Sequence, residues 1–324
     1  HRNMVANVQQ CLAYVGPALR EGEEIVITAL PLYHVFCLTV NCLCFVCFGG
    51  LNVLITNPRD IPLFLSEMRQ WKFTVITGVN TLFNALVNHD KFRELDCSTL
   101  KLTVGGGAAV QRAVAERWRA ITGVPILEGY GLTEASPVVC INPIDLGEFS
   151  ASIGLPIPST DIQVRDDAGD EVPSGERGEL CVRGPQVMSG YWRQPEETAR
   201  AVRDGWLLTG DMAAVDERGF VRIVDRKKDM ILVSGFNVFP SEVEAVVIGC
   251  EGVLEVACIG VPDEKTGEAV KIFVVRKPGA KLSADTILER CRQQLAAYKM
   301  PRHIEFRDSL PKSNVGKVLR RELH

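Results

Sequence analysis

The stretch over residues 125–134 carries side chains that could bind a nucleotide. A short apolar run ends there in a set of small and polar residues: Gly129, Tyr130, Gly131, Thr133 and Glu134. The glycines permit a tight bend on each side of an aromatic face, a hydroxyl can bond a phosphate oxygen, and a carboxylate is a hard metal ligand. The stretch is typical of a strand that ends in a turn holding a flat ring and a metal-bound phosphate. The alternative is a strand end with a packed tyrosine and an exposed glutamate.

Other candidate groups are scattered along the chain. His34 follows an apolar run, Asp211 follows a glycine, Arg226 and Lys228 lie in a run of five charges, and Lys317 lies in a glycine-containing loop. A carboxylate can accept both hydroxyls of a ribose, and a lysine on its flexible stem can reach two anions. Taken singly, each residue also has a structural interpretation as a histidine after a strand, a turn aspartate or a solvated surface charge.

The elements that must position these groups alternate between helix and strand over residues 1–150. The patterns predict helices at 3–15, 38–48, 61–71, 81–88 and 110–122, and strands at 24–30, 51–56, 73–77, 101–104 and 125–127. Short β-branched strands separated by helices predict a mostly parallel sheet covered on both faces, with ligands at the carboxyl ends of the strands. One such end is followed by Gly105, Gly106 and Gly107, which lack the G-x-G-x-x-G spacing of a dinucleotide loop.

The pattern of apolar and polar residues changes after residue 150. Residues 151–225 show short alternating runs separated by turn sequences, which predict a small antiparallel sheet or β-barrel-like subdomain. The charge run at this boundary predicts a solvated turn or, over residues 226–230, a hinge between domains. Residues 231–324 predict a separate α+β domain, with helices at 241–248 and 284–297 and strands at 254–261, 270–275 and 303–306. The expected fold class is therefore α/β: a partial layered large domain, an appended small β-barrel subdomain and a small α+β C-terminal domain.

Composition favours a protein that handles small molecules. The 324 residues are 46% hydrophobic and 23% charged with a net charge of −4, which gives no general attraction to nucleic acid or an anionic membrane. The eleven cysteines lie mostly in apolar runs, which indicates reduced thiols in the cytoplasm. The uncharged segment 35–57 is long enough for a membrane span, but Gly49-Gly50 interrupts it and its asparagines would be costly in lipid.

Five segments, in order along the chain, resemble motifs of the acyl-adenylate-forming (AMP-binding) ligases, the superfamily of acyl-CoA synthetases, luciferases and peptide-synthetase adenylation domains. They are Glu128–Glu134, Thr209–Asp211, Asp225–Lys228, Ser234–Asn237 with Pro240–Glu244, and Pro311–Lys317. The resemblance extends over the whole chain, and Ile76–Leu86 and Ile231–Val238 point to the bacterial long-chain fatty-acid–CoA ligases.

The resemblance implies roles for these residues in forming an acyl-adenylate from ATP. Tyr130 stacks on adenine beside Glu128, Gly129 and Gly131, Thr133 bonds a phosphate oxygen, and Glu134 holds Mg²⁺. Asp211 and Arg226 contact the ribose. Lys317 reaches the attacking carboxylate and the α-phosphate. His34 lies beside the substrate carboxylate, and the loop Gly105–Gly107 lines the acyl and adenine pocket.

The same resemblance implies a second half-reaction, in which coenzyme A takes the acyl group. In the family the small domain rotates about its linker, so residues 231–324 are expected to be mobile. Lys228 matches the family's hinge position, and Gly235 matches the glycine past which the pantetheine moves. The expected partners are a fatty acid, ATP and coenzyme A, with no nucleic acid. Contact with the inner face of the cell membrane and a homodimer stay open.

One departure bears on activity. The family's phosphate loop precedes a segment like His1-Arg2, so the chain is expected to be a fragment, truncated at its N-terminus, that adenylates poorly. The leading hypothesis is an acid–thiol ligase that forms long-chain fatty acyl-CoA. The alternatives are an acyl-AMP ligase that loads a carrier-protein thiol and a non-catalytic nucleotide- or acyl-binding remnant.

Overall fold

The computed structural model describes residues 1–313 and 316–323. Its contacts divide the chain into an N-terminal unit, residues 1–209 with 214–222, and a C-terminal unit, residues 210–213 with 223 onward. The finer division at residues 150, 225 and 230 stays a prediction.

A seven-stranded sheet forms the centre of the N-terminal unit. Its order is β2-β1-β3-β4-β5-β6-β7. The strands are β1 (Ile25–Thr28), β2 (Leu51–Leu54), β3 (Val75–Gly78), β4 (Leu102–Gly105), β5 (Ile126–Gly131), β6 (Val138–Ile141) and β7 (Leu155–Pro156). Strands β1 to β5 pair in parallel, whereas β6 and β7 are antiparallel. This arrangement confirms the predicted α/β fold.

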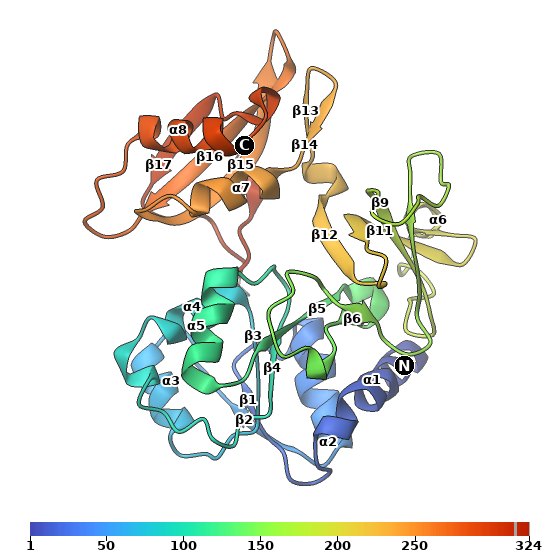
Figure 1. The fold of residues 1–324 in the computed structure, drawn as a ribbon. Helices are drawn as coiled ribbons and strands as arrows, with labels where there is room; N and C mark the ends of the chain where they lie inside the picture. The colour runs from blue at the N-terminus through green and yellow to red at the C-terminus, as the bar shows by residue number, and fades with distance from the viewer. Residues whose placement is uncertain (314–315, 324) are drawn as a thin grey trace. The chain divides into compact units, whose positions relative to one another are not determined.

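Helices cover both faces of this sheet, as Figure 1 shows, with α3, α4 and α5 on one side and α1 and α2 on the other. They are α1 (Arg2–Val15), α2 (Phe45–Cys47), α3 (Ile61–Met68), α4 (Asn80–Val87) and α5 (Arg112–Thr122). Neighbouring strand residues point to opposite faces, so Val26 and Val75 enter one apolar cluster while Ile27 and Ile76 enter the other. Covering both faces is the reason why these strands read as continuous apolar runs.

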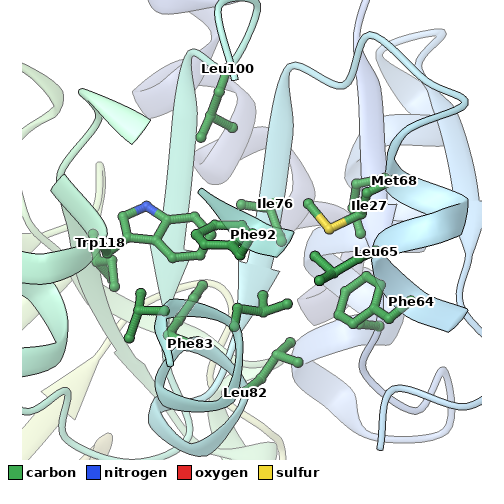
Figure 2. Close-up of a cluster of buried hydrophobic side chains, with 14 of the residues drawn as sticks. Ile27, Phe64, Leu65, Met68, Ile76, Leu82, Phe83, Phe92, Leu100 and Trp118 are labelled. Atoms are coloured by element: carbon green, nitrogen blue, oxygen red, sulfur yellow. The ribbon is translucent and has the colours of Figure 1, made fainter. Parts of the chain in front are cut away.

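The larger cluster is built around Trp118 of α5, which is fully buried (Figure 2). Its ring centroid lies 4.9 Å from that of Phe83 and 5.1 Å from that of Phe92, and its indole N–H donates to Thr103 Oγ1 at 3.2 Å. The indole therefore ties α5 to α4 and to strand β4, whose carboxyl end carries the glycine loop.

The uncharged segment 35–57 folds as η2 (Cys37–Cys44), a π-helix, followed by α2 and the edge strand β2. Asn41 is fully buried, and its side chain bonds the hydroxyls of Thr28 and Thr77 on two neighbouring strands. These partners explain how an asparagine is accommodated in an apolar run. Among the described residues, no helix is long and apolar enough to cross a bilayer.

A second sheet has the order β10-β11-β9-β8, with β12 beside β11. Its strands are β8 (Asp161–Arg165), β9 (Gly178–Arg183), β10 (Val202–Arg203), β11 (Trp206–Val215) and β12 (Val221–Arg226), and helix α6 (Pro195–Ala201) precedes β10. The boundary between the two units passes through β11 and β12.

The C-terminal unit contains a sheet of order β14-β13-β16-β15, with β17 parallel to β16. Its elements are β13 (Ile231–Val233), β14 (Phe236–Val238), α7 (Pro240–Ile248), β15 (Val253–Asp263), β16 (Gly267–Arg276), α8 (Ala284–Gln294) and β17 (His303–Arg307). Sequence reasoning missed the β13–β14 hairpin. Its signal was the Ser234-Gly235 pair, because both residues adopt the positive φ of 51° and 83° that a two-residue hairpin turn requires.

Both faces of this sheet are covered. Val243 and Val247 of α7 and Ile287 of α8 are fully buried in one cluster. On the other face Leu310 and Leu323 pack with Phe273 of β16, so the C-terminal segment is anchored on each side of Lys317.

Candidate active site

The carboxyl ends of three parallel strands meet at one edge of the N-terminal sheet. Gly78 ends β3 and is the register partner of Gly105, which ends β4 and in turn pairs with Glu128 of β5. The Gly106 N–H donates to the carbonyl of Gly78 at 3.1 Å. The glycine loop and the start of the Glu128–Glu134 stretch therefore lie side by side, at the edge where such sheets bind ligands.

The glycines of this loop are closely packed or adopt a backbone conformation that favours glycine. A Cβ at Gly105 would lie 2.7 Å from Val110 and one at Gly106 would lie 3.1 Å from the ring of Phe36, while Gly107 has a φ of +74°. The Phe36 N–H donates to His34 Nδ1 at 3.3 Å. The segment that carries His34 thus lies beside the glycine loop through Phe36.

Glu128 is a buried carboxylate at this edge. Its Oε1 accepts from the Val110 N–H at 2.9 Å, and its Oε2 has no hydrogen-bond partner among the described residues. Burial raises the pKa of Glu128 from 4.5 to about 7, against the lowering effect of the Val110 N–H. Glu128 therefore holds the backbone at Val110, where the glycine loop ends. Near pH 7 its carboxyl group is partly protonated.

The turn expected around Tyr130 begins later than predicted. β5 extends to Gly131, because Gly129, Tyr130 and Gly131 pair with β6. A Cβ at Gly131 would lie 2.2 Å from the Pro137 carbonyl oxygen, whereas a Cβ at Gly129 would make only ordinary contacts. Glycine is thus required at position 131 because the two strands approach each other closely there. The prediction of a tight bend on both sides of Tyr130 was wrong.

Glu134 lies just beyond β5, in the 3-10 turn η4 (Thr133–Ala135). Its Oε1 accepts from the Tyr191 hydroxyl at 2.8 Å, and its backbone carbonyl accepts from the Met188 N–H at 2.7 Å. Partial burial together with the Glu134 carboxylate raises the pKa of Tyr191 to about 12. Thr133 is exposed. Tyr191 was not among the predicted site residues, because nothing in its local sequence connects it with Glu134.

Two further residues hold the segment that follows Glu134. The Thr39 hydroxyl in η2 donates to the Ser136 carbonyl at 2.9 Å. The buried Asn7 amide of α1 bonds both backbone groups of Val138, donating at 2.9 Å and accepting at 3.0 Å. Sequence reasoning missed both, although a polar residue on the buried face of an apolar helix was an available signal.

The C-terminal unit brings together Asp211, Arg226 and Lys317. Asp211 follows Gly210 in β11, is 7% exposed and lies 3.4 Å from the Arg226 guanidinium. Burial lowers the pKa of the Lys317 amine, the positive charge of Arg226 lowers it further, and Asp211 opposes the change. Asp211 and Arg226 thus form an ion pair, and Lys317 lies near enough for both charges to affect its pKa.

The loop that carries Lys317 is closed by backbone pairing. Lys312 and Val318 form a β-bridge, the Ser313 N–H donates to the Lys317 carbonyl at 2.8 Å, and the Lys317 N–H donates to the Ser313 hydroxyl at 3.2 Å. The backbone from which the Lys317 side chain extends is therefore held by hydrogen bonds. Residues 314 and 315 of the predicted Pro311–Lys317 motif lie outside the described part of the chain.

Arg320 joins this loop to the charged run at residues 225–229. Its guanidinium lies 3.1 Å from Asp229 and makes two bonds of 2.8 and 2.9 Å to Glu244, with Asp225 at 3.8 Å. Asp225 also accepts from the Ser241 N–H at the start of α7. Arg320 and Asp225 are therefore paired with charged neighbours and are not isolated surface charges, because the packed C-terminal segment holds them together.

The two residues proposed for the second half-reaction are both exposed. Lys228 lies in η6 (Lys227–Asp229), directly before β13. Gly235 is at the tip of the β13–β14 hairpin, where a Cβ would meet nothing within 4 Å. Its positive φ accounts for the glycine, and the open space leaves room for a ligand to approach.

Sequence comparison places these features among known proteins. The AMP-binding enzyme family model matches residues 1–192, and the AMP-binding enzyme C-terminal domain matches residues 242–317. Long-chain-fatty-acid–CoA ligases of Yersinia pestis and Escherichia coli O6:H1 are 61% and 59% identical over 323 residues. A feruloyl-CoA synthase of Amycolatopsis is 39% identical over 324 residues. The alignments take in all of this chain but 57% of each of the two ligases and 65% of the synthase.

Solved structures agree with the sequence comparison. ATP-bound MatB from Rhodopseudomonas palustris superposes with a TM-score of 0.91 at 33% identity, over all of this chain and 63% of that one. The anthranilate CoA ligase AuaEII, in complex with anthranoyl-AMP, gives a TM-score of 0.87 at 30% identity, over 99% of this chain and 62% of that one. The family models together with the motif residues gathered in each unit show that the chain belongs to the AMP-binding enzyme family.

Proposed function

We propose that this chain is part of an ATP-dependent ligase that converts a long-chain fatty acid into its acyl-adenylate and then into its coenzyme A thioester. The structural observation that carries the proposal is the convergence of Asp211, Arg226 and Lys317 in the C-terminal unit. The identity of 59–61% to long-chain-fatty-acid–CoA ligases supports the choice of substrate.

In the first half-reaction the carboxylate oxygen attacks the α-phosphorus of ATP, and pyrophosphate leaves. Two anions must approach each other, so positioned cations are the main catalytic means. Lys317 supplies a cation to the carboxylate and the α-phosphate. Asp211 accepts the ribose hydroxyls beside Arg226. Tyr130 stacks on the adenine, and His34 with the glycine loop lines the acyl end.

Glu134 suits a Mg²⁺ ligand, because Mg²⁺ in nucleotide enzymes takes one or two carboxylates and completes its shell with phosphate oxygens and water. Its Oε1 is taken by Tyr191, and no described residue donates a hydrogen bond to its Oε2. When bound, the ion would neutralise charge on the phosphates, and the Thr133 hydroxyl is a neighbouring donor to them.

In the second half-reaction the coenzyme A thiol attacks the acyl carbonyl carbon and AMP leaves. Lys228 is the proposed hinge, and Gly235 is the proposed point of passage for the pantetheine. The proposed setting is the cytoplasm, with peripheral contact at the inner face of the membrane, because a fatty acid is delivered from a bilayer.

The direct test supplies pre-formed acyl-adenylates and coenzyme A to the 324-residue chain and follows thioester by mass spectrometry. We expect oleoyl-CoA to form faster than benzoyl-CoA or acetyl-CoA. A carrier protein with a phosphopantetheine thiol serves as the competing acceptor. Thioester formation only on that carrier, or a preference for acetyl- or benzoyl-adenylate, would refute the proposal.

A further inference from the structure

The hydrogen bond between Tyr191 and Glu134 connects two parts of the chain that are far apart in sequence. The phenol hydroxyl donates to Glu134 Oε1 at 2.8 Å, and the Met188 N–H donates to the Glu134 carbonyl at 2.7 Å. Glu134 is therefore held at both its backbone and its side chain by one short segment, residues 185–191. We term this segment the strap.

The strap is itself anchored at several points. Gln186 is fully buried, and its amide donates to Thr160 Oγ1 at 2.7 Å and accepts from Gln10 at 3.2 Å. The Asn3 amide donates to the carbonyls of Pro185 and Val187 at 2.8 and 2.7 Å. The Asn3 and Gln10 side chains of α1 thus hold the first half of the strap by hydrogen bonds.

The second half is fixed by helix α6. The Tyr191 N–H donates to Thr198 Oγ1 at 2.9 Å, and a Cβ at Gly190 would lie 2.5 Å from Thr198 Cγ2. A larger residue here would force Thr198 to shift, and the φ of 148° would strain any residue other than glycine. Tyr191 is 38% exposed, yet its backbone N–H and carbonyl are both hydrogen-bonded, to Thr198 and Gln194.

Since the hydroxyl occupies Oε1, the carboxylate is oriented with Oε2 available, and no described residue donates a hydrogen bond to it. Outer-shell partners of this kind fix the orientation of a metal-binding carboxylate. We propose that Tyr191 is a positioning residue that orients Glu134 toward the nucleotide-bound divalent cation. This inference rests on the proposed cation-binding role of Glu134.

The test measures Mn²⁺ binding in the presence of ATP, by electron paramagnetic resonance, in the 324-residue chain and its variants. Tyr191→Phe removes the hydroxyl and keeps the ring. We expect it to weaken Mn²⁺ binding about tenfold, the low end for outer-shell partners, because water can partly replace an exposed hydroxyl. Binding of AMP without metal should stay within about twofold of the parent. A general loosening of the fold would change both.

Tyr14→Phe is the matched control, since that phenol in α1 donates to the Ile141 carbonyl at 3.1 Å in the same unit. It should leave Mn²⁺ binding unchanged. Glu134→Gln should weaken Mn²⁺ binding at least as much as Tyr191→Phe, and the double variant should be no weaker than Glu134→Gln alone.

The outcomes separate the inference from the proposed function. If Glu134→Gln weakens Mn²⁺ binding and Tyr191→Phe does not, the positioning role is wrong and the cation-binding role stands. An equal loss in Tyr14→Phe also overturns the positioning role. If Glu134→Gln has no effect, both the cation-binding role and the positioning role fall.

Discussion

Replacing Glu128 with glutamine should stabilise the N-terminal unit at neutral and alkaline pH. Burial raises the pKa of this carboxyl from 4.5 to about 7, so the folded state holds the proton more tightly than the unfolded state. The stabilising contribution is complete below pH 4.5 and is lost as the pH rises through about 7. This increase of about 2.5 in the pKa of Glu128 corresponds to a difference of about 3 kcal/mol in unfolding free energy between the protonated and ionised forms.

Glutamine cannot ionise, but it can still accept the hydrogen bond that Val110 donates to Glu128 Oε1. We therefore expect Glu128→Gln to match the parent near pH 4.5 and to exceed its unfolding free energy by about 1–3 kcal/mol at pH 8. The lower bound allows for water that reaches the ionised carboxylate, since Glu128 is 7% exposed.

Urea unfolding at pH 4.5, 6 and 8, followed by tryptophan fluorescence, measures this difference. All four tryptophans lie within residues 1–209, so the signal reports the N-terminal unit. Glu148→Gln, at an exposed position of the same unit, is the control and should show no pH-dependent difference from the parent. A stability difference for Glu128→Gln that is constant with pH, or a less stable variant at pH 8, would refute the reasoning.

Three further substitutions test the packing that supports the site. Asn7→Ala removes the two partly buried hydrogen bonds to the Val138 backbone and should cost about 2–4 kcal/mol in urea unfolding; a loss under about 1 kcal/mol would contradict this. Trp118→Ala should cost about 3–5 kcal/mol by circular dichroism, and Trp118→Phe clearly less; equal costs would show that ring packing is unimportant. Arg320→Met leaves Glu244 without its cationic partner and with only the Cys258 N–H as donor among the described residues, and should cost about 2–4 kcal/mol, less than a fully buried pair because the side chains are 24% and 21% exposed. Hydrogen exchange in α7 measures that loss, and Arg320→Met with Glu244→Gln should recover part of it; no recovery would contradict the pairing.

Local patterns were sufficient for the core elements of the fold. The helix predicted at 3–15 is found as Arg2–Val15, and the strand predicted at 101–104 is found as Leu102–Gly105. These predictions succeed because strands buried on both faces are apolar throughout, and because glycine and asparagine mark their ends. The helix expected over 284–297 ends at Gln294, since element ends depend on tertiary contacts that the pattern does not contain.

The sequence by itself determined the residue types of the Glu128–Glu134 stretch, of Asp211 and Arg226, and of Lys317, together with their order. Only tertiary structure decided that β5 extends through Tyr130, because that extension depends on pairing with β6. It also decided that Tyr191 bonds Glu134 and that Arg320 bonds Glu244. The physical reason is that a sequence shows which groups are available, whereas a distant hydrogen-bond partner is set by the packing that brings the two groups within bonding distance.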